Sequence, residues 1–386
     1  MTIELEPKPL TVQQIWNSPQ LAVIVPTFNE RDNVVSLFDL VTKALGDIPF
    51  EFIVVDDNSP DGTAAVVKEL ARRHANVRCI HRIGRRGLSS AVIEGISASA
   101  APYFAVIDAD HQHDERILPQ MLDKALAGDD IVVGTRYSGS GSVGEGLSKT
   151  REAGSKLATQ LSGLVTGRSL SDPMSGFFLM RREVFDEIAP KLSNEGFKIL
   201  LDVIVSSGRH RAQNGKELVI GEVPYTFRPR HAGESKMSSI VVVQFLGLVL
   251  SKLTGGLLPP TFLMFAFVGG IGVLVNMAAL GVAGRLLNVN NPGDFAKAQT
   301  IAVIVAMTFN FVVNNELTYA NKKLRGWKWL RGLLTFYVIC SIGAVASVSV
   351  GTWIYTFDRS FWLAGVAGVL MSVVFNYSVT RVFTWR

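Results

Sequence analysis

The first half of the chain alternates short apolar runs with amphipathic stretches. The apolar runs predict buried strands over residues 21–25, 52–55, 77–80, 103–107 and 131–133. Helical periodicity between them predicts helices from residue 29 or 30 to 45, over 61–74 and near 87–98. Strands that alternate with helices of this length indicate βαβ crossovers and a mainly parallel sheet. The predicted fold class of this half is therefore α/β, with ligands bound beyond the carboxyl ends of the strands.

From about residue 258 the pattern changes to long apolar stretches. Four of them cover residues 262–286, 298–319, 333–355 and 361–383. Each is long enough to cross a bilayer core of about 30 Å. The preceding stretch, 238–253, is interrupted by Gln244 and Lys252 and is predicted to be an interfacial amphipathic helix. No internal repeat is evident.

These patterns predict four parts in the chain. They are an N-terminal extension (1–20), an α/β domain (21–237), an interfacial region (238–257) and an all-α transmembrane domain with four helices (258–386).

Charge and composition place the predicted domains relative to a membrane. The net charge is +5, and the densest basic cluster, residues 322–331, falls between the second and third apolar stretches. This is typical of a cytoplasmic loop rather than of a nucleic-acid-binding surface. The first 20 residues lack the apolar core of a signal peptide. We therefore expect a multi-pass membrane protein with a cytoplasmic α/β domain, cytoplasmic termini and no nucleic-acid partner.

The two cysteines of the chain, Cys79 and Cys340, lie one in each half. Two separated thiols form neither a disulfide framework nor a zinc cluster.

Polar and acidic residues follow the first two predicted strands. The first segment is Pro26-Thr27-Phe28-Asn29-Glu30, and the second runs from Asp56 through Asp57 to Gly62. Carboxylates at these places suit hydrogen bonds to the base or ribose of a nucleotide. The alternative is helix capping, by Asn29 or Glu30 in the first segment and by Asp61 in the second.

A third polar segment, Asp108-Ala109-Asp110-His111-Gln112, follows the predicted strand 103–107. In an extended chain, residues two apart point to the same side, so Asp108, Asp110 and Gln112 are expected to converge. A set of oxygen ligands selects Mg²⁺ or Mn²⁺. Such an ion neutralises the charge that builds up on a departing diphosphate. The alternative for a bare Asp-x-Asp is a solvated turn.

Basic side chains follow the third segment. Arg136 comes after the strand 131–133, and Arg151 and Ser155 share one face of a predicted helix. Arginine forks suit phosphate oxygens, although surface charge is the alternative. A further segment, 227–236, carries cations that suit a diphosphate, a lipid phosphate or a juxtamembrane anchor. The glycine-rich residues 139–144 match G-x-G-x-x-G but lack a βαβ context, so we interpret them as a mobile loop.

Nine motifs, in this order, resemble one enzyme family. They are PTFNE, VVDDNSPDGT, RRGLSSA, DADHQH, VVGTRY, KTREAGSKLA, DPMSGFF, GFKILLD and FRPRHAGESK. The segment that carries them, about residues 21–237, resembles dolichyl-phosphate mannose synthases and their polyprenyl-phosphate relatives. These enzymes are family 2 glycosyltransferases of the GT-A fold. The last part of the chain resembles the GtrA-like membrane domain fused to some members. Ser89 stands where members commonly have glycine.

The resemblance implies a metal-dependent, inverting transfer of a sugar to a polyprenyl phosphate. The donor it implies is GDP-mannose, with a UDP-sugar as the alternative. It assigns the donor nucleotide to Pro26, Phe28, Glu30, Asp57, Asp108, Ala109, Asp110, Gln112, Arg230 and Lys236. It assigns the metal to Asp108, Asp110 and Gln112, and the acceptor phosphate to Arg136, Arg151 and Ser155. Asp110 and Arg136 are the implied catalytic residues.

Two other functions fit parts of the pattern. A processive polysaccharide synthase would carry a Gln-x-x-Arg-Trp motif, which does not occur in the sequence. A lipid-sugar flippase or scaffold would use polar residues in or near the apolar stretches, namely Asn276, Asn310, Asn314, Asn315, Glu316 and Asn376. Such residues mark either a transport pathway or hydrogen-bonded helix packing.

Overall fold

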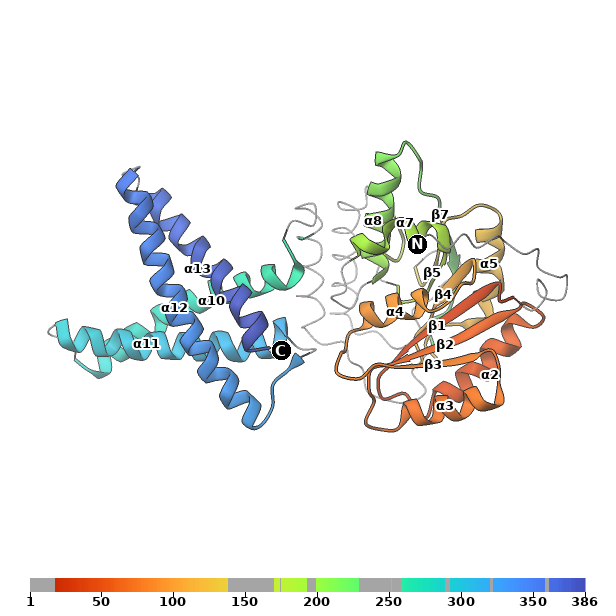
Figure 1. Ribbon diagram of the computed structural model, residues 1–386, viewed down its shortest axis with the longest axis horizontal. Coiled ribbons are helices and arrows are strands. Elements are labelled where there is room, and N and C mark those ends of the chain that lie inside the picture. Colours follow the sequence, from red (N-terminus) through yellow and green to blue (C-terminus); the bar gives the residue numbers. More distant parts are fainter. Residues whose placement is uncertain are drawn as a thin grey trace, which may run out of the picture. The chain divides into compact units, whose positions relative to one another are not determined.

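The computed structural model describes residues 18–137, 170–173, 175–192, 199–228, 251, 258–288, 292–319, 322–357 and 361–385. The chain divides into two compact units, Met1–Ser238 and Ser239–Arg386. Figure 1 shows a sheet flanked by helices in the first unit and long helices in the second.

The first unit contains a seven-stranded sheet of order β3-β2-β1-β4-β6-β5-β7. Its strands are β1 (Leu21–Thr27), β2 (Phe50–Asp56), β3 (Val77–His81), β4 (Tyr103–Val106), β5 (Ile131–Thr135), β6 (Phe178–Arg181) and β7 (Ile220–Pro224). Strand β6 is antiparallel to β4 and β5, and all other pairs are parallel. The prediction of a mainly parallel α/β sheet is confirmed.

The sequence did not predict β6 and β7. Strand β6 is only four residues long, and β7 contains Gly221, Glu222 and Pro224. These residue types are uncommon in strand interiors. They are accommodated because β7 lies at the edge of the sheet and pairs only with β5.

Helices cover both faces of the sheet (Figure 1). One core packs α2 (Val34–Leu45), α3 (Thr63–Arg73) and α5 (Leu118–Leu126) against the first face. The other packs α4 (Leu88–Ser97), α7 (Arg182–Ile188) and α8 (Ile199–Gln213) against the second. Alternate residues of β1 belong to opposite cores, as the two-residue period of a strand requires.

Tight turns connect the strands to the following elements at the carboxyl edge. Asn29, Asn58 and His111, which follow β1, β2 and β4, have φ values of 59°, 55° and 62°. Asparagine is among the residue types that tolerate this left-handed conformation best. Because Asn29 leaves the helical region, α2 begins at Val34 and not at residue 29 or 30 as predicted.

The second unit is helical and corresponds to the four predicted apolar stretches. Its helices are α10 (Pro260–Leu286), α11 (Pro292–Val313), the π-helical segment η3 (Asn314–Thr318), α12 (Trp327–Phe357) and α13 (Phe361–Phe383). Among the described residues, Pro260–Leu286 and Thr300–Thr318 are long and apolar enough to cross a membrane. The predicted basic loop 322–331 is shorter than expected, because α12 begins at Trp327 and carries Lys328 and Arg331.

Candidate active site

The carboxyl edge of the sheet brings the predicted polar segments together. Strands β2, β1 and β4 are neighbours, so the turns after Asp56, Thr27 and Val106 lie next to one another. The turns after β1 and β2 are also joined by hydrogen bonds from backbone N–H groups, from Asn29 to Ser59 Oγ (2.9 Å) and from Glu30 to Thr63 Oγ1 (3.1 Å). The edge is therefore a continuous polar surface, as the strand pattern predicted.

Asp57 is the centre of a buried network at this edge. Its Oδ1 accepts a hydrogen bond from Arg82 Nη1 (2.6 Å), and its Oδ2 accepts one from the Gly87 N–H (2.7 Å). Arg82, which is 2% exposed, also donates to Ser90 Oγ (2.6 Å) and faces Glu94 (2.9 Å). Burial raises the pKa of Asp57, although Gly87 and Arg82 oppose the shift. Both Asp57 oxygens thus hold the connection between β3 and α4.

The other predicted nucleotide residues surround the turn after β1. Pro26 is buried within β1, and the Arg86 guanidinium lies 4.5 Å from the centroid of the Phe28 ring. Glu30 Oε2 accepts a hydrogen bond from Asn33 Nδ2 (2.8 Å). Asp61 Oδ1 accepts one from the Thr63 N–H (3.0 Å), but the N-cap of α3 is Gly62 and not Asp61 as the alternative interpretation held. An aromatic ring and a guanidinium at this place suit the face of a nucleotide base.

The segment Asp108–Gln112 is a turn and not an extended strand. Strand β4 ends at Val106, and His111 adopts a left-handed conformation, so the alternation argument does not apply. Instead, Asp110 Oδ1 accepts a hydrogen bond from the Gln112 N–H (3.1 Å). Asp110 is buried, whereas the Asp108 side chain is 41% exposed. Asp108, Asp110 and Gln112 therefore lie in one tight turn after β4 and not along a strand.

Surrounding residues hold this turn in place. His111 Nε2 contacts Ser36 Oγ (2.9 Å) and the Asn33 carbonyl oxygen (3.1 Å), which ties the turn to α2. His113 Nδ1 accepts a hydrogen bond from the Asp108 N–H (3.2 Å), and the His113 ring stacks on Phe177 at 5.2 Å. Both histidines are buried. Their contacts with α2 and with Phe177 fix the position of the turn.

The donor set fits a hard divalent cation. Two carboxylates and one amide oxygen match the preference of Mg²⁺ and Mn²⁺, which usually retain water and bind substrate phosphates as well. A Cβ at Gly176 would lie 3.0 Å from Asp108 Oδ2, so the absence of a side chain there leaves room around the carboxylate. Among the described residues, no group of three or more His, Cys, Asp or Glu side chains is arranged to hold a metal. A metal ion at this turn would therefore need Gln112 and substrate oxygens as ligands in addition to the two carboxylates.

Arg136 is held by a partner that the sequence analysis did not assign. Its Nε and Nη2 donate to the two carboxylate oxygens of Asp172 at 2.7 and 2.9 Å. Its guanidinium carbon lies 5.1 Å from the ring centroid of Phe227 and 5.3 Å from that of Tyr137. Burial opposes the charge, but the ion pair with Asp172 outweighs it and raises the pKa of Arg136. Arg136 is therefore a fixed cation at the end of β5.

Arg228 joins the Asp108–Gln112 turn to the segment after β7. Its N–H donates to the Gln112 carbonyl oxygen (3.0 Å), and Gln112 Nε2 donates back to the Arg228 carbonyl oxygen (3.2 Å). The guanidinium donates to Asp114 Oδ1 (2.6 Å) and Glu115 Oε2 (2.9 Å). The chain that leads to residue 230 is thus anchored at Gln112.

The remaining predicted site residues are Arg151, Ser155, Arg230 and Lys236. They lie outside the described residues, as do the glycine-rich segment 139–144 and most of the predicted interfacial helix.

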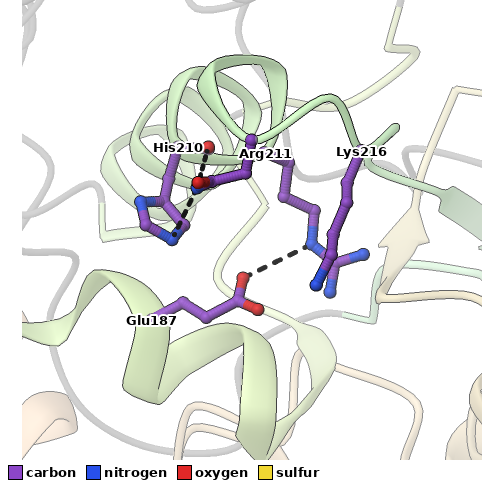
Figure 2. A pocket seen from close by; sticks show the side chains of 5 residues that line it. Glu187, His210, Arg211 and Lys216 are labelled. Carbon is purple, nitrogen blue, oxygen red and sulfur yellow. Dashed lines mark hydrogen bonds and ion pairs between the residues drawn. The ribbon is translucent and has the colours of Figure 1, made fainter.

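A separate pocket lies at the opposite edge of the sheet. It has a volume of about 430 Å³ and is lined by Glu187, His210, Arg211, Asn214 and Lys216. Figure 2 shows the Glu187 carboxylate facing the Arg211 side chain, at 3.5 Å. Arg211 also pairs with Asp130 (3.0 Å), the residue before β5. This pocket contains none of the predicted site residues, and its charges join α7 and α8 to the sheet.

Two family profiles match the chain. Residues 22–189 match "Glycosyl transferase family 2", and residues 264–385 match "GtrA/DPMS, transmembrane domain". The dolichol-phosphate mannosyltransferase of Pyrococcus furiosus is 33% identical over 371 residues, which are 95% of this chain and 99% of that protein. The chain belongs to the dolichol-phosphate mannosyltransferase family. It is a glycosyltransferase with a membrane domain.

Other family members and solved structures are similar to part of the chain. The dolichol-phosphate mannosyltransferase of Mycosarcoma maydis is 36% identical over 60% of this chain and 78% of that protein. A crystal structure of glucosyl-3-phosphoglycerate synthase from Mycobacterium tuberculosis, in complex with Mn²⁺, UDP and its product, has a TM-score of 0.47 and 16% identity. It covers 64% of this chain and 86% of that one.

The sequence analysis of this mannosyltransferase family member assigned no role to several residues that hold the predicted site residues in position. Asp172 and Gly176 lie in the quoted motif DPMSGFF, which could have identified them. Arg228 lies in the quoted motif FRPRHAGESK as well, whereas Arg82 lies outside all of the quoted motifs. Their partners, Glu115 and Asp57, are 113 and 25 residues away in the sequence.

Proposed function

We propose that the protein transfers mannose from GDP-mannose to the phosphate of dolichyl or another polyprenyl phosphate. Family membership over nearly the whole chain carries this proposal. It is supported by a polar edge that combines the Phe28–Arg86 pair, the Asp108–Gln112 turn and the fixed cation Arg136.

The acceptor explains why the site needs no general base. A phosphate monoester has a second pKa of about 6 and is mostly a dianion at neutral pH. It already carries the lone pair that attacks the anomeric carbon, so no side chain has to remove a proton. The protein's task is to hold two anions close together, which requires cations on both sides. A single displacement then inverts the anomeric configuration, from an α-linked donor sugar to a β-linked lipid product.

Cations are available on both sides of this arrangement. Mg²⁺ or Mn²⁺ held by Asp108, Asp110 and Gln112 would neutralise the charge on the departing diphosphate. Arg136, with Arg151 and Ser155 as the resemblance implies, would bind the acceptor phosphate. Arg230 and Lys236 would contact the donor phosphates. Arg228 holds the segment before them against the metal turn.

A transfer assay with purified full-length protein tests the proposal. Radiolabelled GDP-mannose is expected to give a polyprenyl-phosphate mannose with a β linkage, and UDP-glucose and other UDP-sugars are expected to give much less product. Efficient transfer from a UDP-sugar alone would replace the proposed donor. No transfer from any nucleotide-sugar would favour a flippase or scaffold. Retention of the anomeric configuration would contradict the single displacement.

The membrane proposal is that α10, α11, α12 and α13 all span the bilayer and that the catalytic domain (21–237) is cytoplasmic. The interfacial region (238–257) would connect it to the transmembrane domain (258–386). The match to a transmembrane family and the two apolar helices support a membrane protein. On α12, Trp327 and Trp353 are 78% and 64% exposed and lie about 39 Å apart along the helix. That spacing is close to the distance between the two interfaces of a bilayer about 40–45 Å thick, where tryptophan is enriched.

Cysteine labelling tests this topology. In a chain in which Cys79 and Cys340 are replaced by serine, Ser360→Cys is expected to react with a membrane-impermeant maleimide in intact cells. Arg325→Cys is expected to react only after the cells are opened, because the basic segment should be cytoplasmic. The reverse pattern would refute the orientation. Equal labelling of both positions from outside would refute the number of spans.

A further inference from the structure

The two helical hairpins of the second unit repeat one another. One hairpin consists of α10 and α11, and the other of α12 and α13. The first helix of each hairpin buries a phenylalanine, an aliphatic residue and a glycine at the same spacing. These residues are Phe265, Val268 and Gly272 on α10, and Phe336, Ile339 and Gly343 on α12. The second helix of each hairpin shares the pattern Phe-Asn-aromatic followed by Thr-aromatic. It reads Phe309-Asn310-Phe311 with Thr318-Tyr319, and Phe375-Asn376-Tyr377 with Thr384-Trp385.

The contacts of the repeated residues correspond as well. Within each hairpin, an asparagine lies against a glycine. A Cβ added at Gly272 would overlap Asn310 Oδ1, and one added at Gly343 would overlap Asn376 Oδ1. Glycine at these positions lets the two helices approach closely. Asn310 and Asn376 therefore lie at equivalent places between the two helices of their hairpins.

Contacts between the hairpins also occur in matching pairs. The Phe265 ring lies 5.8 Å from Tyr377, and the equivalent Phe336 ring lies 5.7 Å from Phe311. Tyr319 and Trp385 occupy equivalent positions and stack on each other at 4.2 Å. Two equivalent residues can contact each other in this way only near an axis that relates the repeats. The hairpins are therefore arranged about an approximate two-fold axis.

The sequence analysis did not identify this repeat. Over the eleven residues 309–319 and 375–385, only Phe, Asn, Val and Thr are identical at matching positions. Apolar residues are common in any such helix, so these matches are hard to distinguish from composition. The matching contacts make the repeat visible.

The two halves differ in the polar contacts made around Tyr377. The Tyr377 hydroxyl hydrogen-bonds with Thr261 Oγ1 (2.6 Å) and accepts a hydrogen bond from Arg381 Nη1 (3.1 Å). The residues at the equivalent positions of the other half are Phe311, Gly332 and Asn315. Asn315 is buried and holds the backbone of Leu324, whereas Arg381 is exposed. The first half shows that the helices pack without a hydroxyl or a guanidinium here.

We propose that Thr261, Tyr377 and Arg381 form a binding site for a lipid phosphate group. The inference rests on the proposal that these helices span the membrane, since the site then lies at the cytoplasmic interface. A guanidinium matches phosphate oxygens in charge and geometry. Tyr377 orients that guanidinium from one side, and Thr261 fixes the Tyr377 hydroxyl. The ligand is a phosphodiester headgroup or a polyprenyl phosphate monoester, which share this chemistry.

Lipid binding to the full-length protein in detergent tests the site. Native mass spectrometry would count bound phosphatidylglycerol, a short polyprenyl phosphate and zwitterionic phosphatidylcholine. Arg381→Asn and Tyr377→Phe introduce the residues that the other half of the repeat carries, so folding should be retained. Arg381→Asn is expected to weaken binding of one anionic lipid about tenfold, the effect of losing one charge-assisted contact. Tyr377→Phe is expected to weaken it less.

Matched controls separate this site from a general effect of charge. Arg331→Asn removes the same charge from the same end of the domain and is expected to leave binding unchanged. Arg381→Lys keeps the charge but loses the fork, so it is expected to bind less tightly than the wild type. Preferential loss of polyprenyl phosphate in Arg381→Asn, with a raised KM for it, would identify the acceptor as the ligand. Loss of phosphatidylglycerol alone would identify a structural lipid. Unchanged lipid binding in Arg381→Asn, or equal losses in Arg381→Asn and Arg331→Asn, would overturn the site whatever the outcome of the transfer assay.

Discussion

Asp108→Asn is expected to lower sugar transfer by about a thousandfold while leaving the fold intact. The Asp108 side chain is 41% exposed, so replacement by an amide of the same shape should have little effect on packing. It removes one of two carboxylates proposed to hold the metal. Loss of several kcal/mol of charge stabilisation on the departing diphosphate corresponds to about this factor in rate.

Metal binding gives a readout of Asp108 that does not depend on activity. Titration of Mn²⁺, followed by electron paramagnetic resonance in the presence of GDP, should show one tight site in the wild type and its loss in Asp108→Asn. Asp123→Asn, an exposed position on α5, is the matched control and should behave as the wild type. Full transfer by Asp108→Asn, or full activity of the wild type in excess EDTA, would show that the assignment is wrong.

The sequence predicts the frame of this site because strands and their ends have local signals. The five strands predicted between Leu21 and Val133 begin and end within a few residues of the observed strands β1 to β5. The carboxyl ends of parallel strands lie at one edge whatever the details of the turns. Asp57, Asp108 and Arg136 could therefore be assigned to one surface before their contacts were known.

The sequence does not predict how the turns are built. Convergence of Asp108, Asp110 and Gln112 was expected from strand alternation, but these residues lie in a turn with His111 at φ 62°, to which that argument does not apply. Left-handed conformations of residues other than glycine have no strong local signal. The same limit applies to Arg82, Asp172 and Arg228, whose roles depend on partners brought close only by the folded sheet.

The first unit uses buried ion pairs to position groups at the proposed site. The Asp57–Arg82 pair fixes the turn after β2, and the Arg136–Asp172 pair fixes the segment after β5. Buried ion pairs contribute little net stability compared with apolar residues of similar size. Their value here is positional, since a charged group with few allowed orientations is already placed for a charged substrate.

The Arg136–Asp172 pair provides a test that separates position from stability. Asp172→Ala leaves the arginine without its partner in a mostly buried place, so the free energy of unfolding is expected to fall by about 3–5 kcal/mol. Removal of both charges in Arg136→Met with Asp172→Leu should recover most of that loss, because two apolar side chains can pack there. Denaturant unfolding of the detergent-solubilised protein measures both changes.

Sugar transfer by the same three variants decides what Arg136 does. If Arg136 binds the acceptor phosphate, the double variant is stable but still transfers poorly, with a KM for polyprenyl phosphate raised at least about tenfold, since a charge-assisted contact is lost. Its affinity for GDP-mannose should remain close to that of the wild type, because none of the residues assigned to the nucleoside, Pro26, Phe28, Glu30 and Asp57, lies at β5. Recovery of transfer together with stability would show instead that Arg136 serves only the fold. Equal losses of donor and acceptor binding would place Arg136 between the two substrates, where it would stabilise the charge that passes from the acceptor phosphate to the departing diphosphate.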